Sequence, residues 1–176
     1  YEDDKIPDKL VPHIDKFNIL FAGNIGKAQS FDTILNTAKL LKNKKNINFI
    51  ILGTGSDFNK VEKAILVNNL NNIHLIGHIS HRFVKNFINH SDALLISLSN
   101  SQIFSKTIPS KLQLYLASNK PIIGSLNGEA ASIITKSGSG YVSNAEDAEE
   151  LAKNCEIVSN MSKCQFARLS ARGFKL

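Results

Sequence analysis

The chain has 176 residues, of which 43% are hydrophobic and 20% are charged. This composition is typical of one globular domain, and no apolar run is long enough to cross a bilayer. The formal net charge is +6, but the lysines are scattered and few aromatic residues lie among them. Nucleic-acid binding is therefore the least favoured interpretation, whereas the charge suits anions such as phosphorylated ligands or acidic membrane surfaces.

The two cysteines, Cys155 and Cys164, exclude a disulfide framework and a four-cysteine zinc site, and they favour a reducing cytoplasm. The polar start of the chain lacks the pattern of a secretory signal, and its first residue is not methionine, so we expect further residues upstream. We expect residues 1–16 to form a linker or the start of a domain. Residues 17–160 should form one folded domain, and residues 161–176 a basic helix or a tail.

From Phe17 onward, short apolar runs alternate with longer stretches of helical periodicity, a pattern typical of βαβ units. The apolar runs are nearly continuous, as in strands that are buried on both faces. The sequence therefore predicts an α/β fold: a Rossmann-like, doubly wound, parallel six-stranded sheet with helices on both faces. The expected strands are 17–22, 47–52, 73–76, 93–98, 121–125 and 141–143.

The helices between these strands carry apolar stripes at helical spacing, which we interpret as core contacts. The first stripe consists of Phe31, Ile34, Leu35, Ala38 and Leu41, and that of the third helix of Phe83, Val84, Phe87 and Ile88.

Glycine and polar residues collect in the loops that follow the strands, at 23–30, 53–57, 78–81, 99–110 and 127–129. In a doubly wound sheet these loops share one edge, and ligands bind in the crevice beyond the carboxyl ends of the strands. The segment 99–110 is the longest irregular stretch, and long loops of this kind are often functional. The sequence therefore predicts a binding site at this edge.

The first loop contains Gly23, Asn24, Ile25, Gly26 and Lys27 and leads into a helix that begins near residue 30. Glycines let a ligand approach the backbone, a helix start offers free N–H groups, and the lysine adds positive charge. These features suit a phosphate. The spacing matches neither a P-loop nor a Rossmann fingerprint, so an ordinary strand-to-helix turn explains it equally well.

A second candidate anion contact is Lys111, which follows Pro109 and Ser110 at the start of a helix. A cation is mildly unfavourable in a first helical turn unless an anion compensates for it, and a pyrophosphate would be such an anion. A lysine that faces solvent is the competing interpretation. In the two other helix-starting loops we expect caps, from Ser56 or Asp57 in one and from Asn127 in the other.

Glu129 follows Asn127 and Gly128 and suits the first turn of a helix, although its carboxylate could also accept hydrogen bonds from sugar hydroxyls. His78 and His81 are the closest pair of histidines, and they lack further ligands at metal-binding spacing. We therefore expect no metal site. Without a nucleophile elbow or an identifiable base, no catalytic residue is assigned.

Six ordered motifs give the chain a family resemblance: Ala22 to Gln29, Leu52 to Gly55, Leu75 to Ile79, Ile108 to Ala117, Lys120 to Ile123, and Asn127 to Glu129. Over roughly residues 17–158, the chain resembles the C-terminal domain of the family 4 retaining glycosyltransferases, which have two Rossmann-like domains in the GT-B arrangement. It is most similar to the subgroup that adds N-acetylated amino sugars, such as N-acetyl-L-fucosamine, during assembly of bacterial lipopolysaccharide O-antigen or capsule.

The resemblance implies a role for each candidate residue. Near the diphosphate it implies Gly23, Asn24, Ile25, Gly26, Lys27, Ser110 and Lys111. It implies that His78 and Ile79 hold the nucleobase, and that Leu114, Gly128 and Glu129 lie near the ribose or the donor sugar. It implies no cofactor, because the UDP-sugar donor is itself the substrate.

The chain departs from the family pattern at four positions. Most members carry an arginine and a lysine in the first loop, where Asn24 and Gln29 stand here, and two glutamates where Lys106 and Leu114 stand. Leu114 cannot accept a hydrogen bond from the ribose, so the ribose must be held differently.

The expected function is donor binding in the transfer of a sugar from UDP to a lipid-linked or polysaccharide acceptor, with positive groups that neutralise the departing nucleotide. The resemblance implies an N-terminal acceptor domain as a partner, so this chain alone should bind the donor without completing transfer. We expect a cytoplasmic protein, with a peripheral position on the inner face of the membrane as an open alternative.

Two other functions remain open from the sequence. A UDP-N-acetylglucosamine 2-epimerase shares the two-domain architecture, but its catalytic carboxylates and histidines have no identifiable counterparts here. A phosphoacceptor receiver domain also has a doubly wound sheet. The first strand ends in Ala22, Gly23 and Asn24 without the acidic cluster of a receiver.

Overall fold

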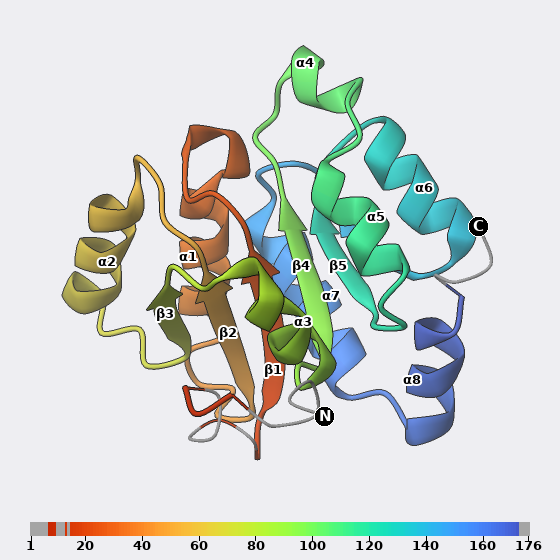
Figure 1. Cartoon of the computed structure of the whole chain (residues 1–176), viewed down its shortest axis with the longest axis horizontal. Helices are drawn as coiled ribbons and strands as arrows, with labels where there is room; N and C mark the ends of the chain where they lie inside the picture. Colours follow the sequence, from red (N-terminus) through yellow and green to blue (C-terminus); the bar gives the residue numbers. More distant parts are fainter. Residues whose placement is uncertain (1–6, 10–12, 14, 173–176) are drawn as a thin grey trace.

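The computed structural model describes residues 7–9, 13 and 15–172. Its single sheet contains six parallel strands in the order β3-β2-β1-β4-β5-β6, which confirms the predicted fold class (Figure 1). The strands are β1 (Phe17–Ala22), β2 (Ile47–Leu52), β3 (Ile73–Gly77), β4 (Ala93–Ser97), β5 (Ile122–Ser125) and β6 (Gly140–Ser143).

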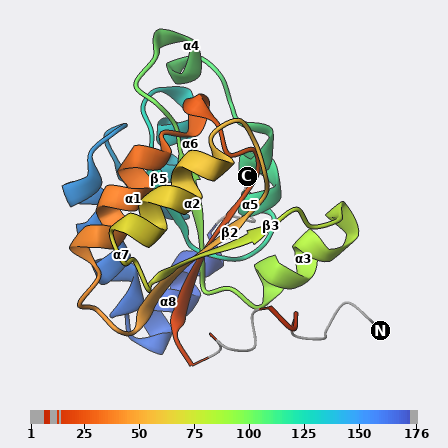
Figure 2. The ribbon, with the colours of Figure 1, turned by 90° about the vertical axis from the view of Figure 1, so that its left-hand side faces the viewer.

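Helices connect the strands and cover both faces of the sheet (Figure 2). The described helices are the 3-10 turn η2 (Lys27–Gln29), α1 (Phe31–Leu40), α2 (Phe58–Val67), α3 (His81–Asn89), α4 (Gln102–Ser105), α5 (Ser110–Leu116), α6 (Glu129–Ser137), α7 (Ala148–Ser159) and α8 (Lys163–Ser170). None of the helices in the described part of the chain is long and apolar enough to span a bilayer.

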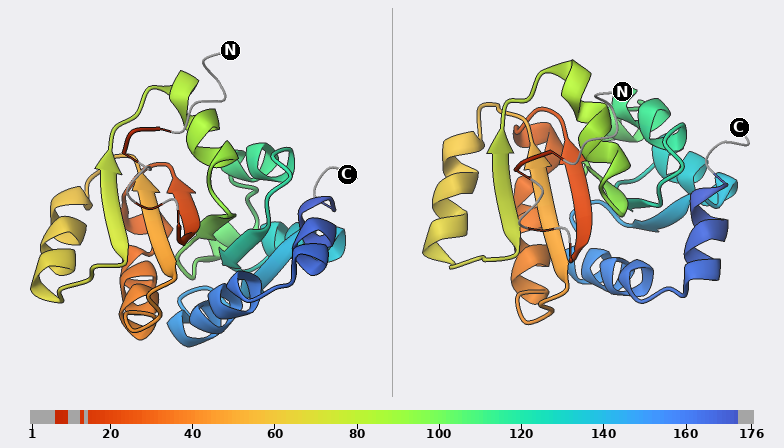
Figure 3. Two further views of the ribbon diagram at one scale, coloured as in Figure 1. Left: turned by 90° about the horizontal axis from the view of Figure 1, so that it is seen from below. Right: turned by 60° about the horizontal axis from the view of Figure 1, so that its bottom comes forward.

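The alternation of side chains along β1 divides the core into two layers. Ile19 and Phe21 point to the layer that contains α1, α2, α7 and α8. Leu20 points to the opposite layer, which contains α3, α5 and α6. Figure 3 shows α1 and α7 (orange and blue) on one side of the sheet, with α3 and α5 (green) on the other. All these β1 side chains are fully buried, as expected for a central strand of a parallel sheet.

The sheet opens between its two central strands. β1 pairs with β4 only at Ile19 and Leu20, whereas its pairing with β2 continues to Ala22. Beyond Leu20 the buried hydroxyl of Tyr115, on α5, accepts a hydrogen bond of 3.0 Å from the Ala22 N–H group. From β1 the sheet continues to β2 and β3 on one side, and from β4 it continues to β5 and β6 on the other. The gap between β1 and β4 is therefore the crevice in which ligands of doubly wound sheets bind.

Several local expectations differ from the structure. The segment 99–110 is not wholly irregular, because it contains the short helix α4, whose first turn is capped by the Ser101 hydroxyl. Phe83, which we placed on a core stripe, is 39% exposed. Asp57 lies at the N-cap position of α2, but neither it nor Asn127 makes a side-chain cap, and Gly128 is the N-cap residue of α6.

The ends of the chain are only partly described. Near the C-terminus, Ser162 and Gln165 form a capping box at the start of α8. Most of the expected N-terminal linker, residues 1–6, 10–12 and 14, and the last residues of the tail, 173–176, lie outside the described residues.

Candidate functional site

A cleft of about 560 Å³ lies at the carboxyl ends of β1 and β4. Its lining consists of Ala22, Gly23, Asn24 and Gln29 from the first loop, His81 and Val84 from α3, and Leu98, Phe104, Thr107, Pro109, Ser110, Lys111, Leu114 and Tyr115 from the segment between β4 and the end of α5. The cleft therefore combines the loops that the sequence predicted at this edge.

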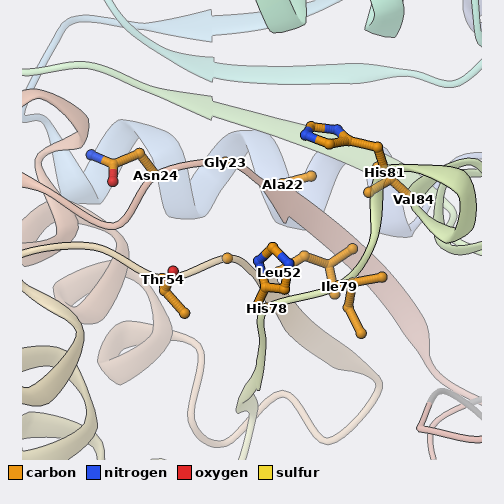
Figure 4. A pocket seen from close by; sticks show the side chains of 10 residues that line it. Ala22, Gly23, Asn24, Leu52, Thr54, His78, Ile79, His81 and Val84 are labelled. Carbon is orange, nitrogen blue, oxygen red and sulfur yellow. The ribbon is translucent and has the colours of Figure 1, made fainter.

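A smaller cleft of about 260 Å³ adjoins the first (Figure 4). The two share Ala22, Gly23, Asn24, His81 and Val84, and the smaller one adds Leu52, Gly53, Thr54, His78 and Ile79. In Figure 4 the loops after β1, β2 and β3 converge on it. An elongated ligand that spans both clefts would cross the carboxyl end of β1.

Lys111 supplies the charge of the larger cleft. Its ammonium group donates a hydrogen bond of 2.9 Å to Gln29 Oε1 and lies 4.0 Å from the centroid of the Phe21 ring. Among the described residues, no Asp or Glu contacts it. Because burial disfavours the charged form, the pKa of Lys111 is lowered to about 8. A buried cation without a carboxylate is unfavourable, and a bound anion would compensate for it.

Gly23 lies directly beside this lysine. A Cβ atom at Gly23 would come within 2.9 Å of Lys111 Nζ, so the missing side chain makes room for the ammonium group. A Cβ at Gly53 would overlap the carbonyl oxygen of Gly23. Gly23 and Gly53 therefore allow parts of the protein itself to pack closely together. This is a structural role, whereas we had expected the glycines of the first loop to make room for a ligand.

Lys27 faces a different part of the molecule. It lies on η2 and lines a separate polar recess of about 230 Å³, together with Asp32, Asp57, Lys60 and Glu146. Within that recess Lys60 forms a salt bridge of 3.0 Å with Asp32. Lys27 and Lys111, which the sequence assigned to one cradle, are therefore separated, and only Lys111 lines the cleft.

The other candidate diphosphate residues divide into two groups. Asn24 and Ser110 line the larger cleft, whereas Ile25 and Gly26, which belong to the same first loop as Asn24, are buried and line neither cleft. Of the nucleobase and ribose candidates, His78 and Ile79 line the smaller cleft and Leu114 lines the larger one.

The loop after β5 lies outside both cleft linings. A Cβ at Gly128 would overlap the carbonyl oxygen of Ser105, so this glycine packs against α4. The Asn127 side chain accepts a hydrogen bond from the Ala145 N–H group at 3.1 Å and donates one to Asn100 at 3.3 Å. Asn127 therefore links neighbouring loops instead of capping α6. Glu129 is exposed in the first turn of that helix.

Sequence reasoning missed two contributors to the site. Tyr115 was noted only within the motif Ile108 to Ala117, and the spacing of residues carries no signal for its hydrogen bond to β1. Gln29 was noted only as a departure from the family pattern, yet it is the hydrogen-bond partner of Lys111. The position of a polar residue at the end of a glycine-containing loop could have indicated that Gln29 contributes to the site.

The sheet order and its crevice define a nucleotide-binding type of α/β domain. Residues 2–170 match the family model of the group 1 glycosyl transferases. Since the match covers nearly the whole sequence, the chain belongs to this family.

Two curated relatives support the assignment. The 2-deoxystreptamine N-acetyl-D-glucosaminyltransferase of Niallia circulans is 27% identical over 162 residues, which cover 90% of this chain and 40% of the relative. The probable glycosyltransferase WbjE of Pseudomonas aeruginosa is 29% identical over 136 residues, which cover 76% of this chain and 33% of the relative. The chain therefore spans less than half the length of either relative.

Solved structures share the fold at low sequence identity. HepE of Anabaena, in complex with UDP, has a TM-score of 0.80 and 10% identity over 94% of this chain and 45% of that protein. The C-terminal domain of a group 1 family protein of Francisella tularensis has a TM-score of 0.71 and 17% identity over 99% of this chain and 87% of that domain. WaaG, a glycosyltransferase involved in lipopolysaccharide biosynthesis, has a TM-score of 0.72 and 15% identity over 99% of this chain and 49% of WaaG. This domain thus has the fold of the C-terminal half of GT-B proteins.

Proposed function

We propose that this chain is the donor-binding half of a glycosyltransferase and that it binds a UDP-sugar across the two clefts. The observation that carries the proposal is Lys111, a cation held at the β1/β4 crevice beside Gly23 and without an acidic partner among the described residues. A diphosphate in the larger cleft would supply the missing negative charge. The Ser110 hydroxyl, which lines the same cleft, is a further donor to a phosphate oxygen.

The smaller cleft suits the nucleobase of the same ligand. It adjoins the larger cleft, and its lining combines the apolar side chains of Leu52, Ile79 and Val84 with the polar groups of Thr54 and His78. A flat pyrimidine needs apolar contact on its faces and a few hydrogen-bonding groups at its edge. The presence of UDP in the related fold of HepE agrees with this assignment.

In the reaction, this half of the enzyme would stabilise the leaving nucleotide. Negative charge grows on the diphosphate as the bond to the sugar breaks, and a preorganised, largely buried ammonium group stabilises that charge more than water does. Lys111 is the residue that we assign to this role. The base and the acceptor site are then left to the N-terminal domain that the family resemblance implies.

The donor sugar that we propose is an N-acetylated amino sugar, and the acceptor a lipid-linked or polysaccharide chain of the bacterial surface. The resemblance to the N-acetyl-L-fucosamine transferases supports this choice, as does the N-acetylglucosaminyl group that the Niallia relative transfers. A cytoplasmic enzyme, free or at the inner face of the membrane, would meet both substrates.

Calorimetric titration with UDP tests the proposal. Replacing Lys111 with methionine keeps the size of the side chain and removes its charge, so we expect the Kd of UDP to rise by at least about tenfold. Lys27→Met is the matched control, since Lys27 is in the first loop but lines the separate recess, and we expect it to change the Kd less than about threefold. Equal losses in the two variants, or no binding of UDP to the wild type at millimolar concentration, would refute the assignment.

A further inference from the structure

Both clefts lack a carboxylate in the part of the chain that the structure describes. Among those residues, none that lines either cleft is Asp or Glu. Two glutamates lie at the same edge of the sheet, but Glu146 lines the separate recess with Lys27, and Glu129 lines neither cleft. In dinucleotide-binding sheets of this type an acidic residue reads the ribose hydroxyls. A nucleotide in these clefts would meet no such group among the described residues.

The position of the ribose follows from the two ends of the ligand. If the base occupies the smaller cleft and the diphosphate contacts Lys111, the ribose crosses the junction, whose side chains are those of Ala22, Asn24, His81 and Val84. Leu114 lines the larger cleft one helical turn beyond Lys111, and 49% of it is exposed. Three of the side chains near the ribose, those of Ala22, Val84 and Leu114, are therefore aliphatic.

The polar side chains at the junction lack the negative charge of a carboxylate. A Cβ atom at Gly55 would lie 2.6 Å from Asn24 Oδ1, and one at Gly26 would lie 2.8 Å from Asn24 Nδ2, so this exposed amide packs over the two glycines and offers a ribose hydroxyl only neutral hydrogen bonds. His81 is the second polar side chain, and each of its ring nitrogens forms one hydrogen bond, whereas a carboxylate accepts from both hydroxyls. One neutral hydrogen bond changes a binding constant by about tenfold at most.

We infer that the cleft does not select for the ribose 2′-hydroxyl and that it binds pyrimidine 2′-deoxyribonucleoside diphosphates about as well as UDP. This inference rests on the proposed function. A site rejects a ligand without a hydroxyl only when a buried group was built to bind that hydroxyl, whereas an apolar wall discriminates weakly. The donors of the enzyme would then include deoxynucleotide sugars beside UDP-sugars.

Paired titrations of the wild-type chain with UDP and dUDP test the inference, because the two ligands differ only in the 2′-hydroxyl. We expect their Kd values to differ by less than about tenfold. In Leu114→Glu the new carboxylate should increase the preference for UDP by more than about tenfold, since hydrogen bonds to a charged acceptor are stronger. Leu114→Met, which conserves the apolar volume, should keep the wild-type ratio.

The outcomes separate the two proposals. If UDP binds and dUDP binds at least about tenfold more weakly, the inference about the 2′-hydroxyl is overturned while the proposed donor site stands. Failure of both nucleotides to bind would overturn the proposed function together with the inference. The wild-type ratio decides the question even if Leu114→Glu does not fold.

Discussion

Lys111 shows how a single residue can be unfavourable for folding and useful for binding. Its ammonium group is largely removed from water, its partners are an amide oxygen and an aromatic ring, and its pKa falls from the ordinary 10.5 to about 8. A difference of this size corresponds to at most about 3 kcal/mol of lost stability. Lys111→Met should therefore unfold at a higher urea concentration than the wild type at pH 7, although it loses the anion contact.

The pH dependence of this difference identifies its cause. Below pH 8 the Lys111 ammonium group is charged in both the folded and the unfolded chain, so the full cost of burial is present. Between about 8 and 10.5 the folded chain holds the neutral amine while the unfolded chain still binds the proton, and the free energy of unfolding rises with pH. Urea unfolding at pH 7 and pH 10 should show the gap between wild type and Lys111→Met becoming smaller. A gap that stays constant would mean that the burial of charge is not its source.

At the scale of elements, the packing of α4 against the loop after β5 depends on one glycine. Gly128 has φ +79°, and a Cβ atom there would overlap the carbonyl oxygen of Ser105 at the end of α4. Gly77 has φ +81°, but its Cβ position has no neighbour within 4 Å. The two positions therefore separate backbone strain from steric overlap.

We expect Gly77→Ala to lower the free energy of unfolding by about 1 kcal/mol, the usual effect of a side chain at positive φ. Gly128→Ala should lower the free energy of unfolding by about 1–3 kcal/mol more than Gly77→Ala does, because α4 must also shift. Since Phe104 of α4 lines the larger cleft, Gly128→Ala should also weaken UDP binding. Equal unfolding midpoints for the two variants would contradict the contact between Gly128 and α4.

The regular elements were the part of the fold that the sequence predicted well. The bounds of β1 and β2 agree with the predicted ones, because each is a continuous apolar run between polar or glycine residues. The stripe of α1 is buried as expected, including Phe31 and Leu41. Periodicity identifies such elements because burial of one face is their main source of stability.

Side-chain directions at the loops could not be predicted in this way. Lys27 and Lys111 both follow strands at the same edge, but Lys27 lies on the 3-10 turn η2 and lines the separate recess, and periodicity says nothing about such a turn. Likewise, the hydroxyl of Tyr115 bonds to Ala22 only because β1 and β4 separate there, which depends on tertiary structure. Spacing therefore located the edge of the site but did not select its cation.

For the whole molecule, the site depends on loops that are joined to one another. The Ser99 N–H group donates to the Ala28 carbonyl at 2.9 Å, and the Asn100 N–H group donates to Glu146 at 3.1 Å, so the loops after β1, β4 and β6 are connected. A ligand in the crevice would contact the first two of these loops together. Binding should therefore stabilise the fold as a unit.

Because binding and folding are coupled, a thermal shift reports donor binding separately from sugar transfer. A ligand that binds only the folded state at about 100 times its Kd adds about 2.7 kcal/mol of stability, which raises the Tm of a domain of this size by roughly 5–10 °C. We expect UDP to produce such a shift in the wild type and a much smaller one in Lys111→Met at the same concentration.

Incubation of the isolated chain with a UDP-N-acetyl amino sugar and an acceptor should give no glycosylated product, because the family resemblance assigns the acceptor site to another domain. Transfer by this chain alone would contradict the assignment of the acceptor site to another domain. The absence of any thermal shift with UDP would refute donor binding itself.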